Sequence, residues 1–314
     1  MAEQPVIVVA GPTASGKSGL AMGLAEELDG TIVNADSMQV YRDLRILTAR
    51  PSRADEDRVP HLLYGDRDAA EAGSAADWAA AAQAAIRSVM DVGRRPVVVG
   101  GTGLYLKALM EGLAPIPAVP DEVRQRAQAR RREIGDVAFH NELATRDPEI
   151  AARLHPGDSQ RVLRAWEVIE ATGRPLSEWQ SEPAAVPDMA FRVILVEPPR
   201  DELYRNCDSR FLDMIEVGAI DEVKALAARA DAEQLNPALP IFKALGYPPL
   251  AGYLRGETPL DDAIVSAQQQ TRNYAKRQTT WLRHQLTAGD GDDPRIGILK
   301  YNYRIDGQLL SFLS

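Results

Sequence analysis

The chain has 314 residues, of which 45% are hydrophobic and 26% are charged, an ordinary balance for a globular protein with a sizeable core. The formal net charge of -9 argues weakly against a nucleic-acid partner. Net charge is a property of the whole chain, however, and a local stripe of basic residues is enough to bind nucleic acid. The one cysteine, Cys207, excludes a disulfide framework and a thiolate zinc site. Because the sequence has no basic leader and no long apolar run, we expect a cytoplasmic protein without a signal peptide or a membrane span.

The first predicted element is a short buried strand at Val6–Ala10, and a glycine-rich loop follows it. This loop fits the phosphate-loop pattern G-x-x-x-x-G-K-[ST] at every fixed position. Its residues are Gly11, Pro12, Thr13, Ala14, Ser15, Gly16, Lys17 and Ser18. Leu20, Leu24 and Leu28 then recur at helical spacing. Strand, loop and helix in this order bind phosphate, because the loop N–H groups and the helix N-terminus face the anion.

Two side chains of the loop carry most of its chemistry. Lys17 supplies a full positive charge to phosphate oxygens, and Ser18 offers a hydroxyl to Mg²⁺, the cofactor that we expect. The ligand is therefore a polyphosphate or a diphosphate, and the loop alone does not distinguish the two.

Polar residues follow two further predicted strands, at 31–34 and 96–99. Asp36 comes after the first of these strands and Thr102 after the second. The fold that we expect is α/β, with a core like that of phosphate-loop nucleoside triphosphatases and a parallel sheet. Strand ends of such a sheet lie together on one edge, so one ligand should reach the loop, Asp36 and Thr102.

Composition changes at 114–120, where three prolines in six residues predict a linker. The next stretch, 121–171, is helical and rich in arginine, and Phe191–Val196 is a strand that returns to the core. Helices are expected at 78–92, at 104–111, at 206–230 with a break near Gly218, and at 260–286. These elements divide the chain into a core at 1–113, a helical insertion at 114–190, the rest of the core at 191–288, and a tail of unknown role at 289–314.

Asp36 is open to three interpretations on its spacing alone. It holds Mg²⁺ in a nucleotide hydrolase, it acts as a general base beside the phosphate loop, or it caps the next turn. The protein as a whole is accordingly a transferase, a small-molecule kinase that uses ATP, or a non-catalytic RNA-binding protein.

Several blocks of sequence resemble the tRNA dimethylallyltransferases, also called the tRNA isopentenyltransferase family. The resemblance runs in order from Val6 to Arg283. Besides the phosphate loop, the matching blocks are Asp36-Ser37-Met38-Gln39-Val40-Tyr41-Arg42, Gly100-Gly101-Thr102-Gly103-Leu104-Tyr105, Thr172-Gly173-Arg174-Pro175, and Ala275-Lys276-Arg277-Gln278.

The resemblance implies a reaction in which a dimethylallyl group moves from dimethylallyl diphosphate to N6 of the adenosine on the 3′ side of a tRNA anticodon. The phosphate loop then holds the diphosphate of the prenyl donor. Asp36 matches the general base of the family, while Lys17, Thr102 and Arg210 match groups that stabilise the departing diphosphate. An alternative for Arg210 is an exposed arginine on a helix.

The resemblance also implies a set of tRNA contacts and a monomeric enzyme. The matching residues are Asp36, Ser37, Met38, Gln39, Thr102, Arg124, Gln160, Arg161, Val162, Leu163, Arg164 and Lys243. Alternatives are a loop hydrogen bond for Gln39 and a solvated helix face for the arginines. The chain departs from the family pattern at Leu47, at Arg50, where lysine is usual, and at Lys243, where arginine is usual. His61 stands without its usual histidine neighbour and is interpreted as structural.

Overall fold

The computed structural model describes residues 4–287, 293–301, 309 and 312–313. The chain divides into two compact units: unit 1 comprises Met1–Met110 and Pro187–Ser314, and unit 2 comprises Glu111–Val186. The insertion expected at 114–190 overlaps unit 2. None of the helices in the described part of the chain has both the length and the apolar content of a membrane span.

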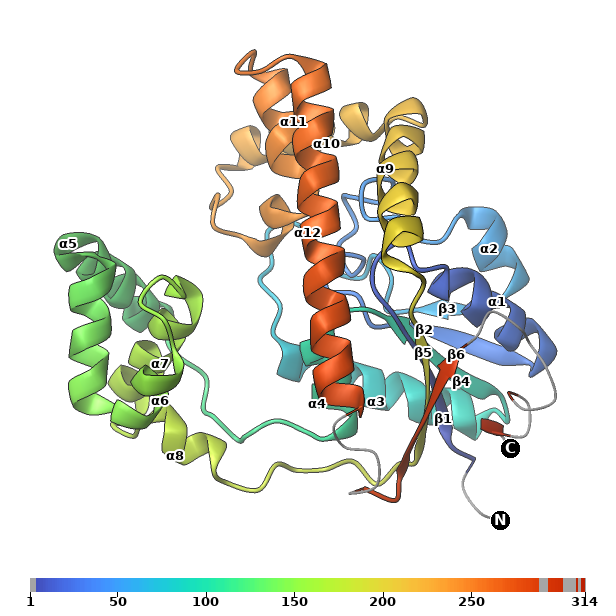
Figure 1. The fold of residues 1–314 in the computed structure, drawn as a ribbon, viewed down its shortest axis with the longest axis horizontal. Coiled ribbons are helices and arrows are strands. Elements are labelled where there is room, and N and C mark those ends of the chain that lie inside the picture. The colour runs from blue at the N-terminus through green and yellow to red at the C-terminus, as the bar shows by residue number, and fades with distance from the viewer. Residues whose placement is uncertain (1–3, 288–292, 302–308, 310–311, 314) are drawn as a thin grey trace. The chain divides into compact units, whose positions relative to one another are not determined.

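Unit 1 is built on a six-stranded parallel sheet with the strand order β3-β2-β4-β1-β5-β6 (Figure 1). The strands are β1 (Val6–Ala10), β2 (Gly30–Asn34), β3 (His61–Leu62), β4 (Arg95–Gly100), β5 (Phe191–Val196) and β6 (Ile296–Tyr301). The predicted α/β fold with a parallel sheet is confirmed, as are the strands expected at Val6–Ala10, 31–34, 96–99 and Phe191–Val196.

The helices of unit 1 follow the predicted order closely (Figure 1). They are α1 (Lys17–Glu27), α2 (Arg53–Arg58), α3 (Ala75–Asp91), α4 (Gly103–Met110), α9 (Arg200–Glu216), α10 (Ala219–Glu233), the 3₁₀ helix η1 (Pro240–Lys243), α11 (Tyr247–Leu254) and α12 (Leu260–Thr287). The break expected near Gly218 separates α9 from α10, and Gly218 there has φ of 108°, which favours glycine.

The central strands of unit 1 could be predicted from the sequence because their residues are buried in its core. Every residue of β1 is buried, because helices cover both faces of the strand. Ile7 and Val9 pack in one cluster with Leu20 and Leu24 of α1. Burial of such side chains contributes about 1.5–3 kcal/mol each and holds the phosphate loop between two well-packed elements.

Five short elements of unit 1 were not predicted: α2, β3, β6, and the helices η1 and α11, which lie between the helices expected at 206–230 and 260–286. Helix α2 lies in the acidic stretch 52–73 and is stabilised by a capping box between Ser52 and Asp55. Strand β3 has only two residues, too few for a periodic signal. Strand β6, in the tail at 289–314, pairs in parallel with β5. Most of the other tail residues lie outside the described part of the chain.

Unit 2 is helical and has a core of its own. Its helices are α5 (Asp121–Arg146), α6 (Pro148–Arg153), α7 (Ser159–Thr172) and α8 (Leu176–Gln180). Phe139, Leu143 and Val162 are buried in this core. The buried carboxylate of Asp147 accepts hydrogen bonds from the backbone N–H of Ile150 at 3.1 Å and of Ser177 at 3.0 Å, which joins the starts of α6 and α8.

We expect Gly100→Ala to lower the free energy of unfolding by about 1–3 kcal/mol. A Cβ atom at this position would lie 2.1 Å from the backbone oxygen of Ala35, so the loops after β2 and β4 would have to separate. Gly19→Ala is the matched control, because its Cβ atom meets nothing within 4 Å and helix propensity favours alanine by about 0.5–1 kcal/mol. Urea unfolding measures both variants. Equal stability of the two would contradict this account of the sheet edge.

Candidate active site

The loops that follow β1, β2 and β4 are hydrogen-bonded to one another at one edge of the sheet. The N–H of Gly11 donates to Gly100 O at 3.4 Å, and the N–H of Thr102 donates to Ala35 O at 3.3 Å. The N–H of Ser37 donates to Thr102 Oγ1 at 3.0 Å. The phosphate loop, the Asp36 loop and the Thr102 loop therefore form one continuous surface, as the topology of the sheet predicts.

The phosphate loop has the left-handed backbone that its pattern requires. Gly16 has φ of 85° at the N-cap of α1, and no side chain caps the N-terminus of this helix. Its first amides are therefore available to an anion. Lys17 extends back across the loop and its ammonium donates to Pro12 O at 3.2 Å. Ser18 is exposed in the first turn of α1.

Two helices from the second half of the chain brace this loop. On α12 the buried amide of Gln278 accepts the N–H of Thr13 at 2.8 Å and donates to Gly101 O at 2.8 Å. On α9 the guanidinium of Arg210 donates to Thr13 Oγ1. Arg210 is thus partly buried against the loop and is not a solvated surface arginine.

Glycines of the Thr102 loop allow α12 to approach so closely. A Cβ atom at Gly101 would lie 2.4 Å from Nε2 of Gln278, and one at Gly103 would lie 2.4 Å from the ring of Trp281. Gln278 was not among the predicted site residues. Its position in the Ala-Lys-Arg-Gln block, which matches the family, was the one sequence feature that indicated a role for it.

The charges of the site act on Lys17 in opposite directions. Burial lowers the pKa of Lys17 to about 8, and nearby Arg210 lowers it too, whereas the Asp36 carboxylate opposes the shift. Burial also raises the pKa of Tyr274 on α12, and Asp36 adds to this rise. Two cations and one carboxylate thus share a partly desolvated site, which favours a ligand that brings negative charge.

One oxygen of Asp36 stabilises the turn that follows it. Oδ1 accepts the N–H of Met38 at 2.8 Å and that of Gln39 at 3.4 Å. This is the capping role that the sequence left open. The other oxygen, Oδ2, has no hydrogen-bond donor among the described residues, so it is available to accept a proton.

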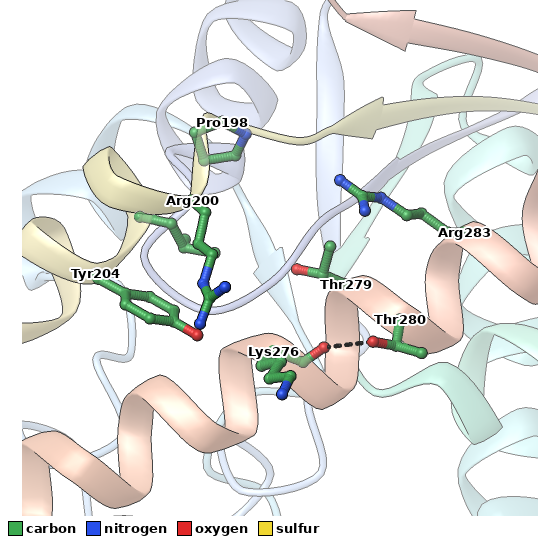
Figure 2. A pocket seen from close by; sticks show the side chains of 8 residues that line it. Pro198, Arg200, Tyr204, Lys276, Thr279, Thr280 and Arg283 are labelled. Carbon is green, nitrogen blue, oxygen red and sulfur yellow. Dashed lines mark hydrogen bonds between the residues drawn. The ribbon is translucent and has the colours of Figure 1, made fainter.

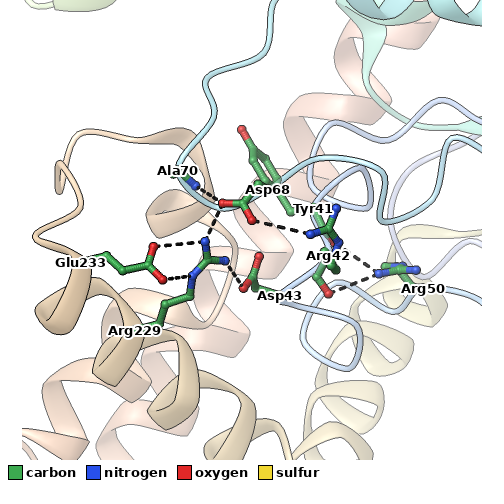
Figure 3. A network of polar contacts seen from close by, with 8 residues as sticks. All are labelled: Tyr41, Arg42, Asp43, Arg50, Asp68, Ala70, Arg229 and Glu233. Carbon is green, nitrogen blue, oxygen red and sulfur yellow. Dashed lines mark hydrogen bonds and ion pairs between the residues drawn. The ribbon is translucent and has the colours of Figure 1, made fainter.

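The segment 38–51 after Asp36 is fixed from a distance by α10. The Glu222 carboxylate accepts three successive backbone N–H groups, those of Arg45 at 2.5 Å, Ile46 at 2.9 Å and Leu47 at 2.8 Å. The guanidinium of Arg229 binds Asp43 and Asp68, each at 2.7 Å (Figure 3). Helix α10 therefore sets the position of this segment beside the phosphate loop.

Within the segment, two polar side chains bind backbone. The amide of Gln39 donates to Thr48 O at 2.8 Å and Ala49 O at 2.9 Å, which is the loop hydrogen bond left open for this residue. The guanidinium of Arg50 donates to Tyr41 O and Arg42 O, each at 3.4 Å (Figure 3).

A cavity of about 250 Å³ lies between this segment and α1. Ser18, Gln39, Arg50 and Tyr64 are among its lining residues. His61 also lines it, and its ring nitrogen lies 2.7 Å from Val59 O, which is consistent with a structural histidine.

The remaining candidate residues are not part of this sheet edge. In unit 2, Arg124, Gln160 and Arg161 are exposed and Arg164 is half-buried. Val162 is 1% exposed in the core of unit 2, and Leu163 packs against that core. Their side chains serve the fold of unit 2. Lys243 is exposed on η1 in unit 1.

The arrangement suits a phosphate ligand and proton transfer. The described residues contain no group of three or more His, Cys, Asp or Glu side chains that could hold a metal ion. A divalent cation here would therefore depend on Ser18, the phosphate oxygens and water, as Mg²⁺ at phosphate sites commonly does.

Comparisons with known proteins give one consistent result. Residues 39–285 match the family model described as IPP transferase. A tRNA dimethylallyltransferase of Rhodospirillum centenum is 58% identical over 93% of each chain, and that of Paramagnetospirillum magneticum is 52% identical over 90% of this chain and 89% of the relative.

Solved structures agree with these relatives. A eukaryotic dimethylallyltransferase acting on tRNA has a TM-score of 0.80 at 28% identity, over 95% of this chain and 74% of that chain. A tRNA isopentenylpyrophosphate transferase of Bacillus halodurans has a TM-score of 0.65 at 31% identity, over 99% of this chain and 94% of that chain.

We expect the affinity for inorganic diphosphate to fall as the pH rises through about 8, because the pKa of Lys17 is about 8 and only its protonated form attracts the anion. The fall should approach about tenfold per pH unit. Lys17→Arg is the control, since a guanidinium stays charged and reports the titration of the ligand alone. Calorimetry from pH 7 to pH 9.5 measures both proteins. Parallel curves would show that Lys17 does not titrate in this range.

Proposed function

Since the chain belongs to the IPP transferase family and has tRNA dimethylallyltransferase activity, we propose how its residues divide the work of that reaction. The observation that carries the proposal is the convergence of three groups at one sheet edge: the phosphate loop, Arg210 and the carboxylate of Asp36. Family membership replaces the two alternatives, an ATP-using kinase and a non-catalytic RNA-binding protein.

In this proposal the phosphate loop holds the diphosphate of dimethylallyl diphosphate. The loop from Gly11 to Ser18 surrounds it and presents the uncapped amides at the start of α1, and Lys17 and Arg210 lie where negative charge grows. As the C1–O bond breaks, its electron pair leaves with the diphosphate, and fixed cations stabilise that charge without reorganisation. The buried Gln278 supports this role because it holds Thr13 in place on the loop.

Asp36 acts as the general base. The N6 amine of adenosine is a weak nucleophile, because its lone pair is delocalised into the ring. As the N6–C1 bond forms, a proton passes from N6 to Oδ2 of Asp36, the oxygen that has no donor among the described residues. Oδ1 meanwhile keeps its bond to the N–H of Met38 and holds the carboxylate in place. Thr102 joins this group through its bond with Ser37.

The hydroxyl of Ser18 would hold Mg²⁺, together with oxygens of the diphosphate and water. When bound, the ion would neutralise part of the charge on the leaving diphosphate. The exposure of Ser18 in the first turn of α1 supports this assignment.

The tRNA is bound by residues of both units. Ser37, Met38 and Gln39 lie beside the base that leaves its stack. The amide nitrogen of Gln39 is held by two loop carbonyls, which leaves its oxygen to accept a hydrogen bond from a base edge. Arg124, Gln160, Arg161 and Arg164 of unit 2 contact phosphates of the anticodon stem, as does Lys243 on η1. We assign the 114–190 segment to this task, and the active form to a monomer in the cytoplasm, where its tRNA substrate is found.

We expect Asp36→Asn to lower kcat about 10²–10⁴-fold. Asparagine keeps an oxygen that can accept the N–H of Met38, so the turn survives and only the proton acceptor is lost. The KM for tRNA and for the prenyl donor should change less than about threefold, because the proton transfer to Asp36 is an interaction made only in the transition state. Transfer of labelled dimethylallyl groups into unmodified tRNA measures these values.

The control is Asp57→Asn, which removes an exposed carboxylate from α2 and should retain full kcat. A near-normal kcat in Asp36→Asn would remove Asp36 from the role of base. Transfer of label from ATP instead of from the prenyl donor would overturn the assignment of the loop ligand.

We expect Arg161→Ala to make the dependence of log Kd for tRNA on log salt less steep by about 1. Arg161 is 74% exposed in its side chain, with one ion pair of 3.4 Å to Asp158. Arg174→Ala is the control, because Arg174 is already bound by Glu178 and Glu182. Filter binding at several KCl concentrations measures both slopes. Identical slopes in the two variants would exclude Arg161 from the phosphate contacts.

A further inference from the structure

A second cavity of about 210 Å³ lies between α9 and α12, on the side of unit 1 where β5 ends (Figure 2). Its space far exceeds that of a single water molecule, about 30 Å³. None of the functions assigned above uses it. Its lining residues are Pro198, Arg200, Leu203, Tyr204, Lys276, Thr279, Thr280 and Arg283.

The charge of this lining is entirely positive. Arg200, Lys276 and Arg283 are its ionisable cations, and the lining contains no carboxylate. Arg283 forms an ion pair with Glu197 outside the cavity. The guanidinium of Arg200 lies 5.1 Å from the centre of the Tyr204 ring, a cation–π contact that fixes the arginine without neutralising it.

Lys276 also keeps its charge uncompensated. No ion pair to Lys276 or to Arg200 is found in the described part of the chain. Helix α9 begins at Arg200 without a side-chain cap, but Asp201 and Glu202 in its first turn offset the positive end of its dipole. The cavity therefore combines a partly open space between two helices with two unpaired cations.

The cavity shares an apolar wall with the phosphate loop. Leu203, which lines the cavity, packs with Cys207 of α9 and Ala275 of α12, and Ala14 of the phosphate loop contacts this same cluster. The next residues along α12 continue the connection, because Gln278 binds the loop while Thr279 lines the cavity. An anion in the cavity would thus be a close neighbour of one in the loop.

We propose that the cavity lined by Arg200, Lys276 and Thr279 is a second binding site for diphosphate, beside the phosphate loop. This inference rests on the proposed function, in which the loop holds the diphosphate of the prenyl donor. The site receives the donor before it enters the loop, or the diphosphate after the C1–O bond has broken.

The charge favours a diphosphate over the backbone of the tRNA. Each phosphodiester of a nucleic acid carries one negative charge, whereas a terminal phosphate group carries about two. Several cations around one partly open cavity match the more highly charged group.

The experiment measures binding of radiolabelled inorganic diphosphate to the full chain by equilibrium dialysis. The wild-type protein should bind two diphosphates per chain. Lys17→Ala should lose the site in the loop, and Arg200→Ala combined with Lys276→Ala should weaken the other site at least about tenfold. Arg205→Ala, an exposed arginine on the same helix, is the matched control and should retain both sites.

Lys276→Glu guards against loss of structure in the double variant, because it reverses one charge at an exposed position; it should weaken the same site. A single site in the wild-type protein, unchanged by the double variant, would overturn the proposal. So would a double variant that binds diphosphate normally but binds tRNA less tightly, since the cations would then serve the nucleic acid.

Failure of the proposed function gives a different result from failure of this inference. If the loop does not hold diphosphate, Lys17→Ala retains the full number of sites, whatever the double variant does. A wild-type protein with two sites, of which Lys17→Ala removes one and the double variant the other, supports both proposals.

Discussion

A single buried amide joins the two halves of unit 1. Gln278 binds the loop after β1 through its oxygen and the loop after β4 through its nitrogen. An unpaired amide at this depth would cost about 1–3 kcal/mol, so both loops are held where the geometry satisfies it. The phosphate loop is thus supported by a helix 265 residues further along the chain. Loss of Gln278 would free Thr13, and with it the hydroxyl that Arg210 binds.

The charges of the site depend on this packing. Burial lowers the pKa of both Lys17 and Arg210, and the charge of Arg210 lowers that of Lys17 further. A diphosphate in the proposed site would relieve this cost, so part of the energy of packing would reappear as affinity for the anion. Asp36 offsets one cation and, in the role proposed for it, also accepts a proton. The two roles are divided between its oxygens, because Oδ1 accepts the hydrogen bonds of the turn and Oδ2 takes no part in them.

The sequence predicted the elements that are buried on both faces. Val6–Ala10 is a continuous apolar run in the centre of the sheet, and Phe191–Val196 is apolar except for Arg192. The meeting of Asp36 with Thr102 follows from parallel topology. By contrast, β6 is an edge strand of intermediate burial, and its weak alternation gave no firm signal. The hydrogen bonds that Gln278 and Glu222 form could not be predicted from the sequence, because their partners lie 265 and 177 residues away along the chain. A motif that matches the family predicted tRNA contacts for Val162 and Leu163, whereas the structure places them in or against the core of unit 2, as their helical spacing indicates.

The hydrogen bonds of Glu222 to the segment 45–47 do not depend on the side chains of that segment. The carboxylate binds N–H groups of the main chain, which every residue except proline possesses. Positions 45–47 can therefore change their side chains and keep the anchor, provided that proline is avoided. Leu47 illustrates this freedom. It is one of the departures from the family pattern, yet its N–H reaches Glu222 at 2.8 Å. The anchor itself therefore makes no demand on the side chains at 45–47, whereas position 222 is restricted to a side chain that can accept three amides.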